Sequence, residues 1–186
     1  PADVAAFQSV HPDIRLVLEE CWSEDAVKRV RGGEIDLGVI VEGADVQGLH
    51  VQPYRGDQLA AVVRHDETLP SDGLKFEDLL DRDLIGLEGS STLTRLLAAQ
   101  ASHLMRAMVL RVQVRSFEAV CRAVEARLGI GVLPLAAAHS FAPAMSLRVL
   151  PLQDEWAQRR MSLVTRAEPA AGTPLALLVQ HLEIGR

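Results

Sequence analysis

Hydroxyl side chains lie at three points where a strand-like run gives way to a helix-like one. These points are Ser23, the segment Ser90–Thr92 and Ser116. Because a helix N-terminus carries unpaired backbone N–H groups and a partial positive charge, each point is a potential anion-binding site. Ser and Thr also cap helices, and for any single one of them this structural role is the commoner one.

Candidate catalytic and metal-binding groups are sparse. The six histidines show no metal-ligand spacing, and Cys21 and Cys121 form no paired motif. We interpret both cysteines as small buried hydrophobes in a reducing compartment, not as a disulfide. The segment Gly89–Thr92 lacks the Gly-Lys-Ser/Thr ending of a phosphate-binding P-loop. We therefore expect a protein that is not an enzyme and that holds no metal ion or cofactor.

The composition argues against several classes of protein. Of the 186 residues, 48% are hydrophobic and 4% are aromatic, and the formal net charge is −6. An acidic chain with few aromatic side chains is unsuited to binding nucleic acid by itself. The sequence contains no run of 18 apolar residues and no N-terminal secretory signal. We therefore expect a cytoplasmic protein without a membrane span.

The elements that position the hydroxyl groups alternate between helix and strand. The spacing of apolar residues predicts a helix over 4–10, a strand over Ile14–Glu19 and a helix from Ser23 to Gly32. Ser23 is expected to cap that second helix with its side chain. A near-continuous apolar run, Ile35–Val41, predicts a strand buried on both faces of a parallel sheet. This alternation indicates the α/β class.

The same alternation continues to the end of the chain. Thr173 and Pro174 are typical of a helix start, and Cys121 falls on the apolar face of the helix that Ser116 begins. Further strands are predicted over 49–54, 59–63, 84–87, 110–115, 130–133, 147–152 and 161–165, and further helices begin near residues 92, 116 and 173.

Two segments of the sequence resemble each other. Leu49–Val63 and Leu147–Val164 each contain a strand, a short polar break and a second strand. Such a pair fits two α/β lobes joined by two hinge strands, in which one segment leads the chain from the first lobe to the second and the other leads it back. It fits a single continuous sheet equally well, so the spacing alone leaves both architectures open.

Three segments, in this order and with this spacing, resemble the effector-binding domain of LysR-type transcriptional regulators. They are Phe7–Glu20 (FQSVHPDIRLVLEE), Arg31–Val41 (RGGEIDLGVIV) and Cys121–Pro134 (CRAVEARLGIGVLP). The resemblance runs through nearly the whole chain. It implies a type II periplasmic-binding-protein fold, an α/β architecture of two Rossmann-like lobes joined by two crossing strands.

The resemblance also implies boundaries within the chain. Lobe I takes residues 1–55 and 160–186, and lobe II takes residues 56–159. The hinge strands are expected near 55–59 and 153–160. The family's winged helix-turn-helix and the first strand of lobe I with its loop have no counterpart in this sequence. We therefore expect the chain to be a piece of a longer regulator.

Carried over position by position, the resemblance implies an effector site built by both lobes. Trp22 stands where the family has a small residue, and it either lines the pocket or packs on the hinge. Arg127 stands where the family usually has Gly, so its backbone is expected to adopt a positive φ. The implied effector-binding residues are Trp22, Ser23, Val41, Glu42, Gly89, Ser90, Ser91, Thr92, Arg115 and Ser116.

The function that the resemblance implies is recognition of a small anionic or polar metabolite in the cleft between the lobes, relayed to a separate DNA-binding domain. The expected partners are a second copy in a homodimer, a tetramer for the full-length protein, and DNA only through the N-terminal domain missing here. A solute-binding protein of a transport system shares the fold and is the alternative. An enzyme on the same scaffold is a weaker third interpretation, because the sequence shows no nucleophile–base pair.

Overall fold

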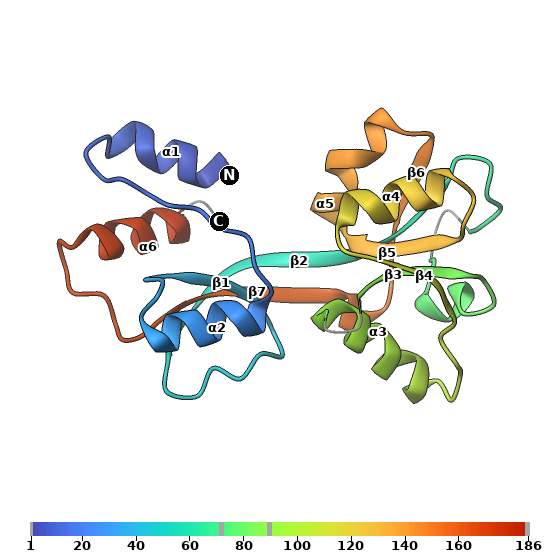
Figure 1. Cartoon of the computed structure of the whole chain (residues 1–186), viewed down its shortest axis with the longest axis horizontal. Coiled ribbons are helices and arrows are strands. Elements are labelled where there is room, and N and C mark those ends of the chain that lie inside the picture. The colour runs from blue at the N-terminus through green and yellow to red at the C-terminus, as the bar shows by residue number, and fades with distance from the viewer. Residues whose placement is uncertain (1, 71–72, 89–90, 185–186) are drawn as a thin grey trace. The chain divides into compact units, whose positions relative to one another are not determined.

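Two strands, β2 (His50–Arg64) and β7 (Gln158–Thr165), carry the chain between two units (Figure 1). Unit 1 comprises residues 1–56 and 160–186, and unit 2 comprises residues 57–159. The structure is a computed structural model that describes residues 2–70, 73–88 and 91–184. Besides the two shared strands, unit 1 contains α1 (Ala2–Val10), α2 (Ser23–Gly32), β1 (Gly38–Val41) and α6 (Pro174–Ile184).

The sheet of unit 1 carries a helix on each face. β1 pairs antiparallel with β7, and β7 lies beside β2. Val164 of β7 packs into the cluster that α2 completes, whereas its neighbour Leu163 packs against Val179 and Leu182 of α6. Because consecutive residues of a strand point to opposite faces, α2 and α6 cover opposite sides of this sheet.

Helix α1 is anchored to the rest of unit 1 at both of its ends. Phe7 is fully buried, and the centroid of its ring lies 5.5 Å from that of His181 on α6. The Asp3 carboxylate accepts hydrogen bonds from the Tyr54 hydroxyl (2.5 Å) and the Arg55 guanidinium (2.7 Å) on β2. These donors lower the pKa of Asp3, and burial raises the pKa of Tyr54 to about 12.

The strand predicted over Ile14–Glu19 is wrong. Residues 14–19 form no helix or strand, and the Val17 and Leu18 side chains are 78% and 64% exposed. Apolar–polar alternation makes a strand only where another strand supplies hydrogen-bond partners, and no strand among the described residues pairs with this segment. Cys21 follows directly and is exposed, so only Cys121 is the buried cysteine that we expected.

The strand predicted over Ile35–Val41 is shorter and less buried than expected. It covers only the four residues of β1, lies at the edge of the sheet and pairs antiparallel, not parallel. Val39 is consequently 47% exposed. A run of apolar residues indicates burial but carries no information on the direction of the partner strand, which explains the error.

Unit 2 is built on a mixed sheet with a parallel centre. β3 (Leu84–Leu87) pairs in parallel with both β4 (Leu110–Val114) and β5 (Ile130–Pro134). β2 pairs antiparallel with β5 and with β6 (Leu147–Pro151). All four residues of β3 are buried, as expected for a central strand. The helices are α3 (Thr92–His103), α4 (Phe117–Glu125) and α5 (Leu135–Phe141), with 3-10 turns at Phe76–Leu79, Ala142–Ala144 and Glu155–Ala157.

One predicted strand break is wrong, and one helix was not predicted. The two strands predicted over 49–54 and 59–63 form the single 15-residue strand β2. Gly56 suggested a turn, but it continues the strand without a positive φ. Helix α5 was not predicted, because Pro134 signalled only the end of a strand; the same residue also stands at the N-cap of α5.

Arg127 has the positive φ expected from its position, at 66°. A non-glycine residue in this region stores backbone strain, which the surrounding contacts must offset. The Arg127 guanidinium donates to the Asp66 carboxylate over 2.8 Å, and Arg64 donates to the same carboxylate over 2.9 Å. These two arginines lower the pKa of Asp66 to about 2, with Arg64 making the larger contribution.

A buried ion pair joins the two shared strands at the boundary of unit 2. Asp57 on β2 and Arg159 on β7 form it, and both side chains are only 9% exposed. Removing one partner of a buried pair leaves the other charge without compensation in a poorly solvated place. The pair therefore fixes how β2 and β7 lie together where they leave unit 2.

Replacing Asp57 tests this role. We expect Asp57→Asn to lower the free energy of unfolding by about 3 kcal/mol, because Arg159 stays buried and unpaired. The matched control is Asp83→Asn, which breaks a half-exposed pair with Arg111 and is expected to cost less than about 1 kcal/mol. Urea denaturation followed by circular dichroism measures both. Equal losses for the two variants would show that the pair at 57 and 159 has no special role.

Candidate functional site

The parallel centre of unit 2 places two helix starts at one edge of its sheet. Leu87, the last residue of β3, lies opposite Val114, the last residue of β4. The carboxyl ends of these neighbouring strands therefore coincide, and α3 and α4 begin within a few residues of them. In open α/β sheets this edge is where ligands bind.

The start of α3 contains two hydroxyl groups that make no hydrogen bond to any described residue. Ser91 is the N-cap residue and is fully buried, and Thr92 is the first helical residue. The Ser91 Oγ and Thr92 Oγ1 atoms are both buried, and neither has a hydrogen-bond partner among the described residues. Native proteins rarely leave such groups unsatisfied, so this helix start is a candidate site for a further partner. Gly89 and Ser90, also predicted site residues, lie outside the described part of the chain.

At the start of α4, the Ser116 hydroxyl and the Nε atom of Arg115 already make hydrogen bonds. The Ser116 hydroxyl accepts a hydrogen bond from the Ala119 backbone N–H over 3.2 Å, which is the structural capping role. The Arg115 guanidinium donates from Nε to the Glu88 carboxylate over 2.7 Å, and this hydrogen bond raises the pKa of Arg115. Sequence reasoning missed Glu88, because only the β3–β4 pairing brings it to Arg115.

The predicted residues of unit 1 also lie together. We expected the Ser23 hydroxyl to cap α2, and this prediction is wrong. The hydroxyl instead accepts a hydrogen bond from the Val41 backbone N–H over 3.2 Å. It thereby ties the start of α2 to the end of β1. Trp22 takes the N-cap position and is half-buried. Glu42 is exposed, and its backbone N–H donates to the Arg160 carbonyl over 3.1 Å.

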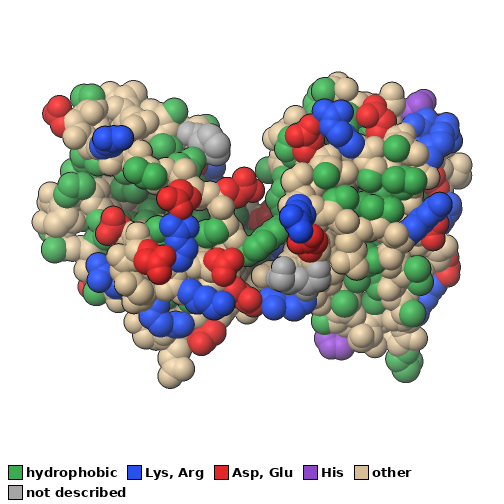
Figure 2. Space-filling view, in the orientation of Figure 1, with side chains coloured by type: hydrophobic (Ala, Val, Ile, Leu, Met, Phe, Trp, Pro, Cys, Tyr) green, Lys and Arg blue, Asp and Glu red, His purple; other side chains and the backbone are tan. Residues whose placement is uncertain are grey.

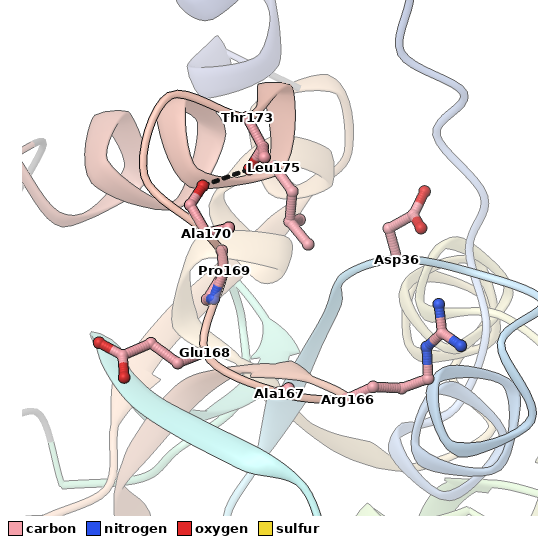
Figure 3. A pocket seen from close by; sticks show the side chains of 8 residues that line it. All are labelled: Asp36, Arg166, Ala167, Glu168, Pro169, Ala170, Thr173 and Leu175. Atoms are coloured by element: carbon pink, nitrogen blue, oxygen red, sulfur yellow. Dashed lines mark hydrogen bonds between the residues drawn. The ribbon is translucent and has the colours of Figure 1, made fainter.

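A surface hollow of about 460 Å³ in unit 1 contains none of the predicted residues (Figure 3). It lies beside the loop between β7 and α6, and in Figure 3 Asp36 and Arg166 lie on the side of it opposite Glu168. Since Val41 pairs with Met161 and Gly38 with Val164, the hollow and Val41 lie toward opposite ends of β1. The hollow is lined by Asp36, Arg166, Ala167, Glu168, Pro169, Ala170, Thr173 and Leu175.

A second hollow, of about 380 Å³ in unit 2, is lined mainly by charged side chains. It includes Arg64, whose guanidinium donates to the Glu125 carbonyl at the C-terminus of α4 over 2.9 Å. Cations are favourable at helix C-termini, and Asp66 forms ion pairs with both Arg64 and Arg127. The charged side chains that line this hollow are therefore explained by ion pairs within the protein.

Charges of opposite sign lie close together over much of the surface. On the face shown in Figure 2, Lys and Arg side chains stand next to Asp and Glu side chains. No helix among the described residues is long and apolar enough to cross a membrane. The described residues contain no cluster of three or more His, Cys, Asp or Glu side chains that is able to hold a metal ion.

A comparison with known families decides the classification. The sequence profile described as LysR substrate binding domain matches residues 1–184. The chain belongs to this family. It is 25% identical over 185 residues to the uncharacterized HTH-type transcriptional regulator YbhD of Escherichia coli K12, covering 96% of this chain and 58% of that protein. This LysR domain thus spans about half the length of the curated relatives it matches.

Solved structures show the same fold at low sequence identity. The CcmR regulatory domain of Synechocystis PCC6803, in complex with 2-PG, superposes with a TM-score of 0.88 at 21% identity, covering 100% of this chain and 89% of that one. The BenM effector binding domain with its effector benzoate gives a TM-score of 0.83 at 19% identity, covering 98% and 83%. The predicted α/β class and the type II periplasmic-binding-protein-like fold of LysR effector-binding domains are confirmed.

The two helix starts of unit 2 are expected to respond differently to loss of a hydroxyl. Ser116→Ala removes a cap and should lower the free energy of unfolding by about 1 kcal/mol. Ser91→Ala removes a buried group without a partner among the described residues, so the free energy of unfolding should stay the same or rise. Urea denaturation measures both. A loss at Ser91 as large as that at Ser116 would mean that the Ser91 hydroxyl is structural.

Proposed function

We propose that this chain is the effector-sensing domain of a LysR-type transcriptional regulator. It binds a small anionic or polar metabolite and relays binding to a separate DNA-binding domain. The observation that carries the proposal is a pair of buried hydroxyls at the start of α3, Ser91 Oγ and Thr92 Oγ1, for which residues 2–70, 73–88 and 91–184 supply no hydrogen-bond partner. Family membership supplies the regulatory context.

The chemistry of this helix start suits an anion or a strongly polar group. The first backbone N–H groups of a helix have no partner within the helix, and the helix dipole is positive there. Two neighbouring hydroxyls add donors to the same place. BenM binds benzoate, a carboxylate, and CcmR binds 2-PG, and both fit this kind of site.

We assign the complementary contacts to unit 1. Trp22, Ser23, Val41 and Glu42 lie where α2 begins and β1 ends, and Ser23 holds those two ends together. A ligand that contacts both groups favours the arrangement of units in which both contacts are made. Only such a difference in affinity between arrangements shifts a conformational equilibrium.

The same proposal covers partners and location. The relatives are helix-turn-helix transcriptional regulators, which favours a regulator over a solute-binding protein. We propose a homodimer formed through this domain, a tetramer of the full-length protein, and DNA contact only through a separate domain. A regulator that acts on DNA in a bacterium works in the cytoplasm.

Ligand screening tests the proposed function. Thermal-shift measurements against small organic acids and phosphates should identify at least one compound that binds, and calorimetry then gives its affinity. We expect Ser91→Ala to weaken binding about tenfold, the effect of losing a hydrogen bond to a charged group. The control is Ser116→Ala, whose hydroxyl already serves the helix. If both variants bind as tightly as the unmodified chain, the assigned site is wrong.

A further inference from the structure

Arg115, one of the predicted site residues, forms an ion pair with the Glu88 side chain. The pair lies at the carboxyl ends of β3 and β4, and the Glu88 carbonyl accepts a hydrogen bond from the Ser91 backbone N–H over 2.8 Å. It therefore adjoins the start of α3, where the hydroxyls lack partners. Arg115 is 86% exposed, whereas Glu88 is half-exposed.

The contact between the two side chains uses only part of the guanidinium. Arg115 donates from Nε, and its two terminal nitrogens make no hydrogen bond within the part of the chain that the structure describes. A guanidinium binds a carboxylate or phosphate best through two parallel N–H groups, and that fork remains available in Arg115. Exposed ion pairs are weak, so a second anion competes with Glu88 at little cost.

We propose that Glu88 is a resident carboxylate that competes with the effector for Arg115 and so sets the affinity for anionic ligands. The inference rests on the proposed function and names the ligand class: a compound with a carboxylate or phosphate group. Arg115 binds that group, and the start of α3 binds the remaining polar atoms. Glu88 is a positioning residue, because it acts on the ligand through Arg115.

The chain contains a matched control for this arrangement. Asp83 and Arg111 form an ion pair between the same two strands, at their amino ends, with an N–O distance of 2.9 Å and both side chains half-exposed. Asp83→Asn therefore removes the same charge from the same pair of strands, but at the edge away from α3. Comparing it with Glu88→Gln separates a local effect from a change in net charge.

Calorimetric titration with benzoate, inorganic phosphate and the neutral analogue benzamide tests the inference. We expect Glu88→Gln to bind both anions about two- to fivefold more tightly at low salt, the fold-change that corresponds to an exposed ion pair. Arg115→Gln should bind them about tenfold more weakly. Asp83→Asn should bind them as the unmodified chain does, and the affinity for benzamide should not change in any variant. Added salt should reduce the gain in Glu88→Gln.

Three results would overturn the inference. Equal gains in Glu88→Gln and Asp83→Asn would make the effect one of net charge alone. If neither benzoate nor phosphate binds, both to the unmodified chain and to Glu88→Gln, an anion site at Arg115 is excluded. Binding that is lost in Ser91→Ala but unchanged in the Glu88 and Arg115 variants would leave the proposed function standing and refute the role of Glu88.

Discussion

The parallel pairing of β3 with β4 and β5 is the constraint on which the candidate site depends. It aligns the carboxyl ends of neighbouring strands, so the helices that follow must begin along the same edge. The start of α3 and the Glu88–Arg115 pair come together for this reason alone, since 27 residues of sequence separate Glu88 from Arg115. The complete burial of β3 keeps that edge in place.

The three hydroxyl-bearing points, which the sequence does not distinguish, have different tasks in the structure. Ser116 caps its own helix, and Ser23 joins the start of one helix to the end of a strand through the Val41 N–H. Ser91 does neither, although it occupies the N-cap position. A capping side chain stabilises the protein, whereas a buried hydroxyl without a partner costs free energy. That difference is why we propose the start of α3, and not the other two points, as the binding site.

Local patterns were predictable from the sequence, and long-range pairing was not. Helices such as α4 follow from apolar spacing and a capping Ser, and the positive φ of Arg127 follows from its place in a recognised segment. The strand expected over Ile14–Glu19 and the parallel pairing of β1 failed because both depend on a partner strand that a single segment does not specify. Glu88 was missed for the same reason.

The central claim is that the start of α3 binds the effector. The most direct measurement is the change in backbone amide chemical shifts, recorded by NMR, when a bound compound from the ligand screen is added to the isotopically labelled chain. The account predicts that the amides of residues 91–94 shift most in unit 2, together with those near Ser23 in unit 1. Shifts concentrated instead around Arg166 and Ala170, beside the hollow of unit 1, would contradict it.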